Sequence, residues 1–337
     1  MFDYLIVGAG FAGSVLAERL ASQLGKRVLV CDKRPHVGGN AYDCFDDAGI
    51  LIHKYGPQVF HTSSPRIFDY LSQFTAWRPY EHRVLASVNG QLLPFPINVD
   101  TINRLYGTSM SPAEVQTFLA ETKTRRELEE LFFRDVARDV RMSYDDRFYT
   151  DEFQAMPLRG FTRMFENMLD HRNISLVLQT DYRDVVGEVP FREMIYSGPI
   201  DAFFGYRFGK LPYLSVELKF ETRDVAVYQP AAVIAHPSEP LYTRVTELKW
   251  LTGQTHPKTT LVHEIPRADG EPYYPVLRPE NIALHRRYKA LGDSQGGVYF
   301  VGRLATYRNC EMDEVVGQSL DLFDRIAGVA PAEPEAA

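Results

Sequence analysis

The spacing of apolar residues predicts alternating strands and helices from the first residues onward. Residues 4–7 form an apolar run with strand character, and a glycine-rich turn leads from them into residues 14–24, where apolar positions recur at helical spacing. Residues 27–31 form a second run with strand character. This order of strand, turn, helix and strand predicts an α/β fold.

The rest of the chain continues with further helices and with strands that alternate in the manner of an antiparallel sheet. Asn89-Gly90, between two apolar runs, predicts a hairpin over residues 83–95, because Asn-Gly favours the turns that match strand twist. Ser111 predicts the cap of one helix that continues to about Val136. The remaining helices are expected at residues 65–74, 98–105, 161–168, 279–291 and 313–326, and the remaining strands at residues 49–62 (ending in a Gly-Pro turn), 174–179, 194–199, 213–221, 225–234 and 298–301.

The first turn has the spacing of a dinucleotide-binding loop. Gly8, Gly10 and Gly13 can supply, in order, a tight turn, close approach of the backbone to a pyrophosphate, and close packing of helix on strand. The following helix offers free N–H groups and the positive end of its dipole to phosphates. Asp32, after the next strand, lies where a ribose-binding carboxylate belongs. The alternative is an ordinary turn with a solvated aspartate.

A second glycine pair narrows the choice of cofactor. Gly38-Gly39, just beyond Asp32, would let the backbone approach the same pyrophosphate from the other side. This doublet resembles the FAD-binding flavoproteins with two dinucleotide domains more than the simple NAD dehydrogenases, so we expect FAD. Near the C-terminus, a strand followed by Gly302 and a helix supplies a second helix N-terminus directed at a cofactor.

Composition limits the remaining possibilities. With 337 residues, 45% hydrophobic and 24% charged, the chain can bury a large core and is expected to form two or three lobes. The net charge of −7 does not favour a nucleic-acid partner. No apolar run is long enough to span a bilayer, and the first residues lack the features of a signal peptide, so we expect a cytoplasmic protein. The spacings of Cys31, Cys44 and Cys310 favour neither disulfides nor a metal site.

Seven blocks in order along nearly the whole chain resemble the signature blocks of the UDP-galactopyranose mutases. They are Gly8-Ala9-Gly10-Phe11-Ala12-Gly13, Gly38-Gly39-Asn40-Ala41-Tyr42, Tyr55-Gly56-Pro57 with Phe60-His61-Thr62, Pro94-Phe95-Pro96-Ile97-Asn98, Tyr242-Thr243-Arg244, Pro272-Tyr273-Tyr274-Pro275 and Val301-Gly302-Arg303-Leu304-Ala305-Thr306-Tyr307-Arg308.

This resemblance implies a Rossmann-like FAD-binding domain with a small helical insert and an antiparallel-sheet substrate domain. The FAD-binding domain is expected at residues 1–75, 185–210 and 295–330, the shortened insert at 98–140, the substrate domain at 76–97, 141–184 and 211–294, and a disordered tail at 331–337.

The resemblance also implies a redox-neutral isomerase. In this family reduced FAD acts as a nucleophile at the anomeric carbon, the nucleoside diphosphate leaves, and the sugar recloses as a furanose after a flavin N5–sugar adduct. The expected substrate is a nucleoside-diphosphate hexose, UDP-galactose or a related sugar nucleotide. Two alternatives remain: a diverged relative that acts on another nucleotide-linked small molecule, and a non-catalytic flavin-binding protein.

A diphosphate held above a flavin calls for arginines, whose guanidinium forks match phosphate oxygens, and for tyrosines, whose hydroxyls donate without adding charge. The alternatives are a structural salt bridge for Arg244 and Arg303, a solvated charged loop for Arg141, and an aromatic core position for Tyr274. For His61 and His53 the alternative is a structural role. The resemblance assigns catalytic or substrate-binding roles to Arg244, Arg141, Arg303, Tyr274, Gln58 and His61. The residues expected to bind the cofactor are Gly8, Gly10, Phe11, Ala12, Gly13, Asp32, Lys33, Gly38, Gly39, Asn40, Gly56, Pro57, Gln58, Gly302, Arg303, Met312 and Asp313; no metal site is expected.

The chain departs from the family on the substrate side. The segment between Asn98 and Arg141 is shorter than usual and lacks the block Gly-Tyr-Thr-x-Lys-Gln-Trp, whose tryptophan stacks on uracil. Neither Trp77 nor Trp250 lies in such a block. Bacterial relatives pair through the insert, so a homodimer is a possible assembly. Other positions also differ: Gln58 stands for the usual histidine, Ala235-His236 for Asn-Tyr, Asn309 for a phosphate-binding tyrosine and Glu311 for an aspartate.

Overall fold

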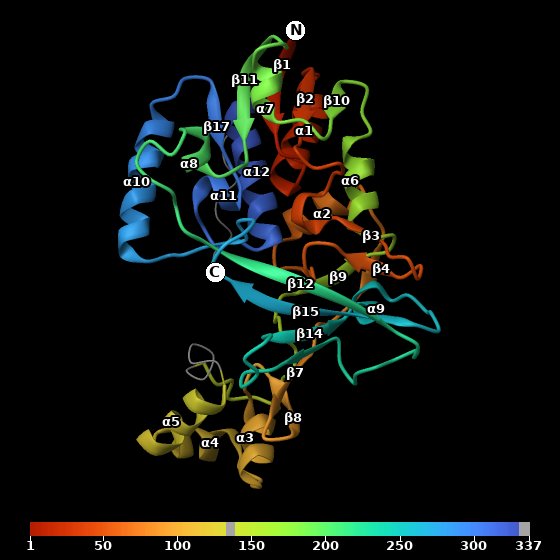
Figure 1. Ribbon diagram of the computed structural model, residues 1–337, viewed down its shortest axis with the longest axis vertical. Coiled ribbons are helices and arrows are strands. Elements are labelled where there is room, and N and C mark those ends of the chain that lie inside the picture. The colour runs from red at the N-terminus through yellow and green to blue at the C-terminus, as the bar shows by residue number, and fades with distance from the viewer. Residues whose placement is uncertain (133–138, 330–337) are drawn as a thin grey trace.

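A five-stranded parallel sheet forms the half of the molecule that contains the N-terminus (Figure 1). The computed structural model describes residues 1–132 and 139–329. The strand order is β10-β2-β1-β11-β17, and every neighbouring pair is parallel. The strands are β1 (Phe2–Val7), β2 (Val28–Cys31), β10 (Ile174–Val177), β11 (Phe191–Tyr196) and β17 (Val298–Phe300).

Helices cover both faces of this sheet because successive side chains of each strand point to opposite sides. Tyr4 and Ile6 of β1 belong to the main core, whereas Leu5 belongs to a second core on the other face. The helices α1 (Phe11–Leu24), α6 (Phe161–Leu169) and α12 (Met312–Ala327) pack together in the main core, and α2 (Pro65–Ser72) packs on α12. The other elements of this half are α7 (Tyr182–Val186), α8 (Ile200–Phe203), α10 (Pro279–Asp293), α11 (Arg303–Thr306) and a 3-10 turn at Gly39–Ala41.

A seven-stranded mixed sheet lies beside the parallel one, and its two long strands, β12 and β15, cross the middle of Figure 1. Its order is β16-β12-β15-β14-β13-β7-β8, in which only β13 and β7 run parallel. The strands are β7 (Val84–Val88), β8 (Gln91–Phe95), β12 (Tyr213–Arg223), β13 (Val233–Ala235), β14 (Arg244–Glu247), β15 (Thr259–Arg267) and β16 (Tyr274–Pro275), and α9 (Leu248–Thr252) follows β14. The expected antiparallel substrate sheet is therefore present with one parallel pair.

The helical insert follows β8 and lies at the end of the molecule farthest from the N-terminus (Figure 1). Asn98 caps its first helix, accepting the N–H of Thr101 at 2.9 Å. The single helix expected from Pro112 to about Val136 was wrong: the chain turns at Ala120, and the extended Glu121 begins a new helix. Val136 lies outside the described residues. The insert helices are α3 (Val99–Tyr106), α4 (Pro112–Leu119) and α5 (Thr122–Leu131).

Two expected strands are shorter than predicted, one because of its backbone conformation and the other because of local hydrogen bonds. The strand predicted over residues 49–62 is interrupted at Gly56, whose φ is +101°, and at Pro57, which has no N–H. Most of residues 225–234 is irregular because the N–H groups of Tyr228 and Gln229 bond to the carboxylate of Glu247 instead of a neighbouring strand. The interrupted segment forms β4 (Leu51–His53), which pairs with β3 (Asp43–Phe45), and β5 (Phe60–Thr62), which joins β9 (Phe153–Pro157) and β6 (Trp77–Pro79).

The predicted domain boundaries need correction at α6, which was assigned to the substrate domain but packs on α1, and at two further elements. Strand β10 was assigned to the substrate domain, but it pairs with β2 in the parallel sheet. Helix α10, also assigned there, contacts α8 and β17 of the parallel-sheet half. The expected tail at residues 331–337 lies outside the described residues. Within the described parts of the chain, none of the helices combines the length and apolar character needed to cross a membrane.

The remaining predicted elements are confirmed to within a few residues at their ends. They include the first strand, helix and second strand, the hairpin, and the helices near residues 65–74, 98–105, 161–168, 279–291 and 313–326. Asn89 and Gly90 both have positive φ, +50° and +78°, as the turn type that matches strand twist requires.

Candidate active site

The larger of two adjoining cavities, about 510 Å³, opens at the carboxyl ends of the parallel strands. Val7, Cys31 and Tyr196, the last residues of β1, β2 and β11, all line it. Ligands of open α/β sheets bind at this edge, where loops diverge above the strand ends. We call this space the cofactor cavity.

Glycines make the wall of the cofactor cavity from bare backbone. Gly8 has a φ of +104°, and a side chain on it would meet Ser197 Oγ at 2.2 Å. The two glycine loops touch, because a Cβ on Gly39 would lie 3.0 Å from the Cα of Gly10. Gly13 does not line the cavity; a Cβ there would lie 1.9 Å from the carbonyl oxygen of Gly8. It lets α1 seat against the first turn, and Gly10 begins α1 without a side-chain cap, leaving its N–H groups available.

Asp32 ties the two loops together at one end of the cavity. Its carboxylate accepts the N–H of Ala9 at 2.8 Å and the N–H of Arg34 at 2.9 Å. Each oxygen keeps a lone pair for a ligand hydroxyl. Residues 180–183 also line this end, which the sequence analysis missed because they follow β10, a strand assigned to the other domain.

A charged bridge crosses the cofactor cavity from one half of the molecule to the other. Arg34 bonds to Glu271 at 2.9 Å and to Asn40 at 2.9 Å, and its guanidinium lies 4.0 Å from the ring centre of Tyr55. Lys33 lies 3.4 Å from the same Glu271 carboxylate. Burial opposes ionisation of Glu271, but the bond from Arg34 and the charge of Lys33 outweigh it and lower its pKa. The loop just before Tyr273 and Tyr274 is thereby fastened to the β2 loop.

Most of the predicted cofactor residues line the cofactor cavity. Gly56 and Pro57 line the second cavity instead, and Gly13 and Asp313 line neither. Arg303 donates to the carbonyl oxygen of Cys310 from Nε at 3.0 Å and lies 5.3 Å from the ring centre of Tyr274. The residues that do line the cofactor cavity are Gly8, Gly10, Phe11, Ala12, Asp32, Lys33, Gly38, Gly39, Asn40, Gln58, Gly302, Arg303 and Met312.

The second cavity, about 360 Å³, lies against the mixed sheet, and we call it the sheet cavity. Gln58, Tyr273 and Tyr274 line both cavities and mark where they meet. Its apolar floor comes from four strands: Val84 of β7, Phe95 of β8, Val216 and Leu218 of β12, and Val233 and Ala235 of β13, with Arg244 and Thr246 of β14 beside them.

The pKa values of several titratable side chains that line the sheet cavity are shifted by burial. Arg244 Nε lies 3.4 Å from Glu264, whose side chain is 13% exposed. Burial raises the pKa of Glu264, and the charge of Arg244 partly offsets this. Burial, with smaller contributions from Arg244 and His61, lowers the pKa of His82 to about 4. Burial raises the pKa of Tyr273 to about 12, so its hydroxyl stays protonated at neutral pH.

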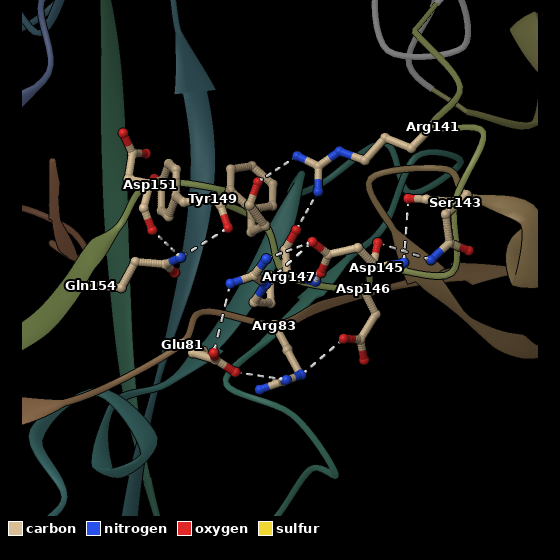
Figure 2. A network of polar contacts seen from close by, with 12 residues as sticks. Glu81, Arg83, Arg141, Ser143, Asp145, Asp146, Arg147, Tyr149, Asp151 and Gln154 are labelled. Atoms are coloured by element: carbon tan, nitrogen blue, oxygen red, sulfur yellow. Dashed lines mark hydrogen bonds and ion pairs between the residues drawn. The ribbon is translucent and has the colours of Figure 1, made fainter. Parts of the chain in front are cut away.

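Arg141 lines neither cavity. As Figure 2 shows, its guanidinium points back at its own loop, where it donates to the carbonyl oxygens of Arg147 and Phe148, the latter at 2.8 Å. Arg147 and Arg83 bond to the acidic side chains around them and hold this loop against β7. Arg141 therefore supports the segment that brings Phe148 and Tyr149 to the sheet cavity.

His61 also lines neither cavity and has a similar supporting position. Its Nδ1 lies 2.9 Å from Asp151, and its ring stacks on Tyr149 at 3.6 Å. Tyr149 lines the sheet cavity, and burial raises the pKa of its hydroxyl, which remains a donor at neutral pH. The sequence contained no motif for Tyr149, whose position becomes apparent only when β5 and β9 pair.

Comparison with known proteins agrees with this geometry. A family model described as UDP-galactopyranose mutase matches residues 121–309, and an NAD(P)-binding Rossmann-like domain matches residues 6–74. A probable UDP-galactopyranose mutase of Klebsiella pneumoniae is 35% identical, over 98% of this chain and 96% of the relative. The chain belongs to the UDP-galactopyranose mutase family. A dTDP-fucopyranose mutase of Escherichia coli is 31% identical, over 95% of this chain and 97% of the relative. A crystal structure of reduced UDP-galactopyranose mutase has the same fold, with a TM-score of 0.75 at 15% identity, covering 99% of this chain and 95% of that one.

Within this family, the departures noted in the sequence fall into two groups. Ala235 and Gln58 line the sheet cavity, so these two changes alter its wall directly. Asn309 and Glu311 line neither cavity; Glu311 caps α12 through a bond with Glu314. The alignment with the Klebsiella protein extends over 373 positions, more than the 337 residues here, so that relative has segments that this chain lacks.

Neither of the two tryptophans takes the place of the tryptophan in the missing Gly-Tyr-Thr-x-Lys-Gln-Trp block. Trp77 stacks on Phe60 and Phe68, with ring centres 4.9 and 5.4 Å away, and Trp250 is 41% exposed. Neither lines either cavity. Among residues 1–132 and 139–329, no group of three or more His, Cys, Asp or Glu side chains could hold a metal ion.

Proposed function

We propose that this protein is an FAD-dependent isomerase that interconverts the pyranose and furanose forms of a nucleoside-diphosphate hexose, either UDP-galactose or a related sugar nucleotide. The observation that carries the proposal is the junction of the two cavities at Gln58, Tyr273 and Tyr274. A dinucleotide cradle on one side and an arginine-bearing cavity on the other would bring a cofactor ring and a diphosphate sugar face to face. The family relationship supports the same reaction.

The residues of the cofactor cavity fit FAD. The bare backbone at Gly8, Gly10 and Gly39 leaves room for a pyrophosphate between two loops, and Asp32 is available to the ribose. Residues 180–183 would enclose the adenosine end, and the ring would extend toward Gln58. When bound in reduced form, FAD would supply the electron pair that displaces the diphosphate from the anomeric carbon of the sugar.

The chain's own part is to bind the diphosphate, orient the sugar and exclude water. The Arg244 side chain is 53% exposed and lies beside the buried Glu264. Its guanidinium would therefore be held at the cavity and still be free to bond a diphosphate. Tyr149, Tyr273 and Tyr274 would donate hydroxyl hydrogen bonds without adding charge. The apolar floor would keep water away from the reacting carbon.

The test is furanose formation by protein reduced with dithionite. UDP-galactopyranose and dTDP-fucopyranose are each incubated with reduced and with oxidised protein, and the products are separated by chromatography. We expect furanose from at least one sugar nucleotide with reduced protein only. No furanose from either substrate, in protein that retains its flavin, would contradict the proposal.

Arg244 provides the matched variant for this assay. Arg244→Ala removes charge-assisted hydrogen bonds to the diphosphate, so we expect kcat/KM to fall roughly 10–100-fold. Arg244→Lys should recover only part of the loss, because a lysine keeps the charge but not the planar fork. Flavin content, measured from the visible absorbance, should not change. A loss of flavin parallel to the loss of activity would mean that Arg244 supports the fold and not the substrate.

A further inference from the structure

One buried hydroxyl in the sheet cavity has no partner. Seven side-chain oxygen or nitrogen atoms in the described parts of the chain are buried without a hydrogen bond, and one of them is Oγ1 of Thr246. Thr246 is fully buried and lines the sheet cavity. The residues that carry the other six atoms line neither cavity: Gln154, Asp201, Thr252, Thr259, His285 and Gln318.

The register of the mixed sheet shows why the protein itself cannot satisfy this hydroxyl. Thr246 lies opposite Val233 of β13, Val233 lies opposite Val84 of β7, and Val84 lies opposite Phe95 of β8. On its other side Thr246 faces Val262 of β15. It is thus the one polar side chain in an apolar row across the cavity floor. A valine would fill this position with the same shape and no cost of desolvation. Thr246 differs from the other residues with unpaired atoms because it lines a cavity, where a ligand group can pair with its hydroxyl.

Neighbouring charges indicate what kind of ligand group reaches Thr246. Arg244, two residues earlier on the same face of β14, is half exposed and suits the diphosphate. Thr246 lies deeper, among neutral apolar groups, with the carboxyl of Glu264 in the adjacent row, and an anion there would be poorly solvated. A hydroxyl group both donates and accepts, as threonine does. The matching ligand group is a sugar hydroxyl.

We propose that Thr246 Oγ1 hydrogen-bonds a hydroxyl group of the hexose and is a specificity-determining residue of the sheet cavity. The proposal rests on the proposed function, since it takes the hexose to be the occupant of this cavity. It concerns the sugar and not the nucleotide, so it can be tested by binding as well as by turnover.

The experiment compares Thr246→Val with the parent holoenzyme by calorimetric binding of UDP-galactose, dTDP-fucose derivatives of the same anomeric form, and the free nucleotides UDP and dTDP. We expect Thr246→Val to bind at least one sugar nucleotide about tenfold more weakly and to bind UDP and dTDP as the parent does. Thr246→Ser, which keeps the hydroxyl, should restore binding. A loss confined to UDP-galactose would place the hydroxyl at C6, because fucose lacks it.

Thr259→Val is the matched control. Thr259 is also fully buried with an unpaired hydroxyl, but it lies on β15 away from both cavities. Both valine variants should melt at or above the parent temperature, since each replaces an unpaired buried hydroxyl by a methyl group. Only Thr246→Val should change binding of the sugar nucleotides.

Two results would overturn the inference and leave the proposed function standing. Thr246→Val could bind every sugar nucleotide as the parent does, which would mean that the hydroxyl pairs only with water. Alternatively, both Thr246→Val and Thr246→Ser could lose binding together with thermal stability, which would make the role structural. Absence of furanose formation by the parent, with the binding difference intact, would instead contradict the proposed function alone.

Discussion

The two adjoining cavities differ in which part of the chain forms their walls. The cofactor cavity owes its shape to backbone: glycine turns at the ends of parallel strands, with two loops in contact at Gly10 and Gly39. The sheet cavity owes its shape to side chains, which come from the strands of the mixed sheet and from the segments around Gln58 and Tyr149. Backbone shape tolerates little change, whereas side chains can be exchanged one at a time. The wall of the sheet cavity can therefore change while the cofactor cavity keeps its shape.

The largest effect on the cofactor cavity should come from a side chain placed between α1 and the glycine turn that forms its wall. In Gly13→Ala the new Cβ would lie 1.9 Å from the carbonyl oxygen of Gly8 and 3.0 Å from Ile6, so α1 must move away from the first turn. We expect the variant to lose most of its flavin on dialysis and to be destabilised by about 1–3 kcal/mol or more, as overpacked cores are. Flavin content is read from the ratio of visible to ultraviolet absorbance, and stability from thermal unfolding.

Gly187→Ala is the control for that variant. Gly187 has an ordinary φ of −79°, and a Cβ on it would meet nothing within 4 Å. Its flavin content should equal that of the parent. Full flavin retention by Gly13→Ala would show that the first turn can relax, and that the cradle is less rigid than its contacts indicate.

Acidification should lower the stability of the folded protein through His82 and His53. Burial lowers the pKa of His82 and of His53 to about 4, and His53 Nδ1 accepts the N–H of Gln58 at 2.9 Å, which requires an unprotonated nitrogen. Between pH 6.5 and 4 the unfolded chain binds more protons at these two residues than the folded chain does, so stability rises with pH across this window and falls on acidification. The loss should be roughly 1–3 kcal/mol for each histidine by pH 4.

His82→Gln should flatten this acid slope in a series of melting temperatures from pH 7 to pH 4. Equal slopes in the parent and in His82→Gln would mean that His82 is not held neutral by its surroundings.

Most of the residues predicted to bind the cofactor line one cavity, because each part of that prediction is local. Gly8, Gly10 and Gly13 follow one strand, and Asp32 and Gly38-Gly39 follow the next. A short stretch of chain therefore contains all the residues by which a dinucleotide-binding loop is identified. Residues 180–183 escaped notice because they reach the cavity only through the pairing of β10 with β2.

The sheet side was predicted less well because its residues meet only through long-range register. Strand β15, Thr259–Arg267, was not expected, since His263, Glu264 and Pro266 interrupt its apolar pattern; it is held by pairing with β12 and β14. Arg141 and His61, assigned to the site from resemblance, line neither cavity; their contacts are with the loop and ring of Tyr149. No local sequence pattern could identify Thr246. Its hydroxyl is unpaired because the residues opposite it on β13 and β15 are valines, and this becomes apparent only from the strand pairing.

The smallest predicted effect is at the bridge that joins the two sides. Glu271→Gln removes the ion pairs with Arg34 and Lys33, but the Glu271 side chain is 52% exposed, so solvent screens most of the interaction. We expect the dissociation constant for FAD to rise about two- to fivefold at low salt, with the difference shrinking as salt is added. Glu217→Gln breaks a comparable pair with Arg267, at 50% exposure and away from both cavities, and should leave FAD affinity unchanged. An effect of Glu271→Gln that persists at high salt would mean that Glu271 acts by positioning Tyr273 and Tyr274 and not by its charge. The two cavities would then be coupled through this loop more tightly than an exposed ion pair allows.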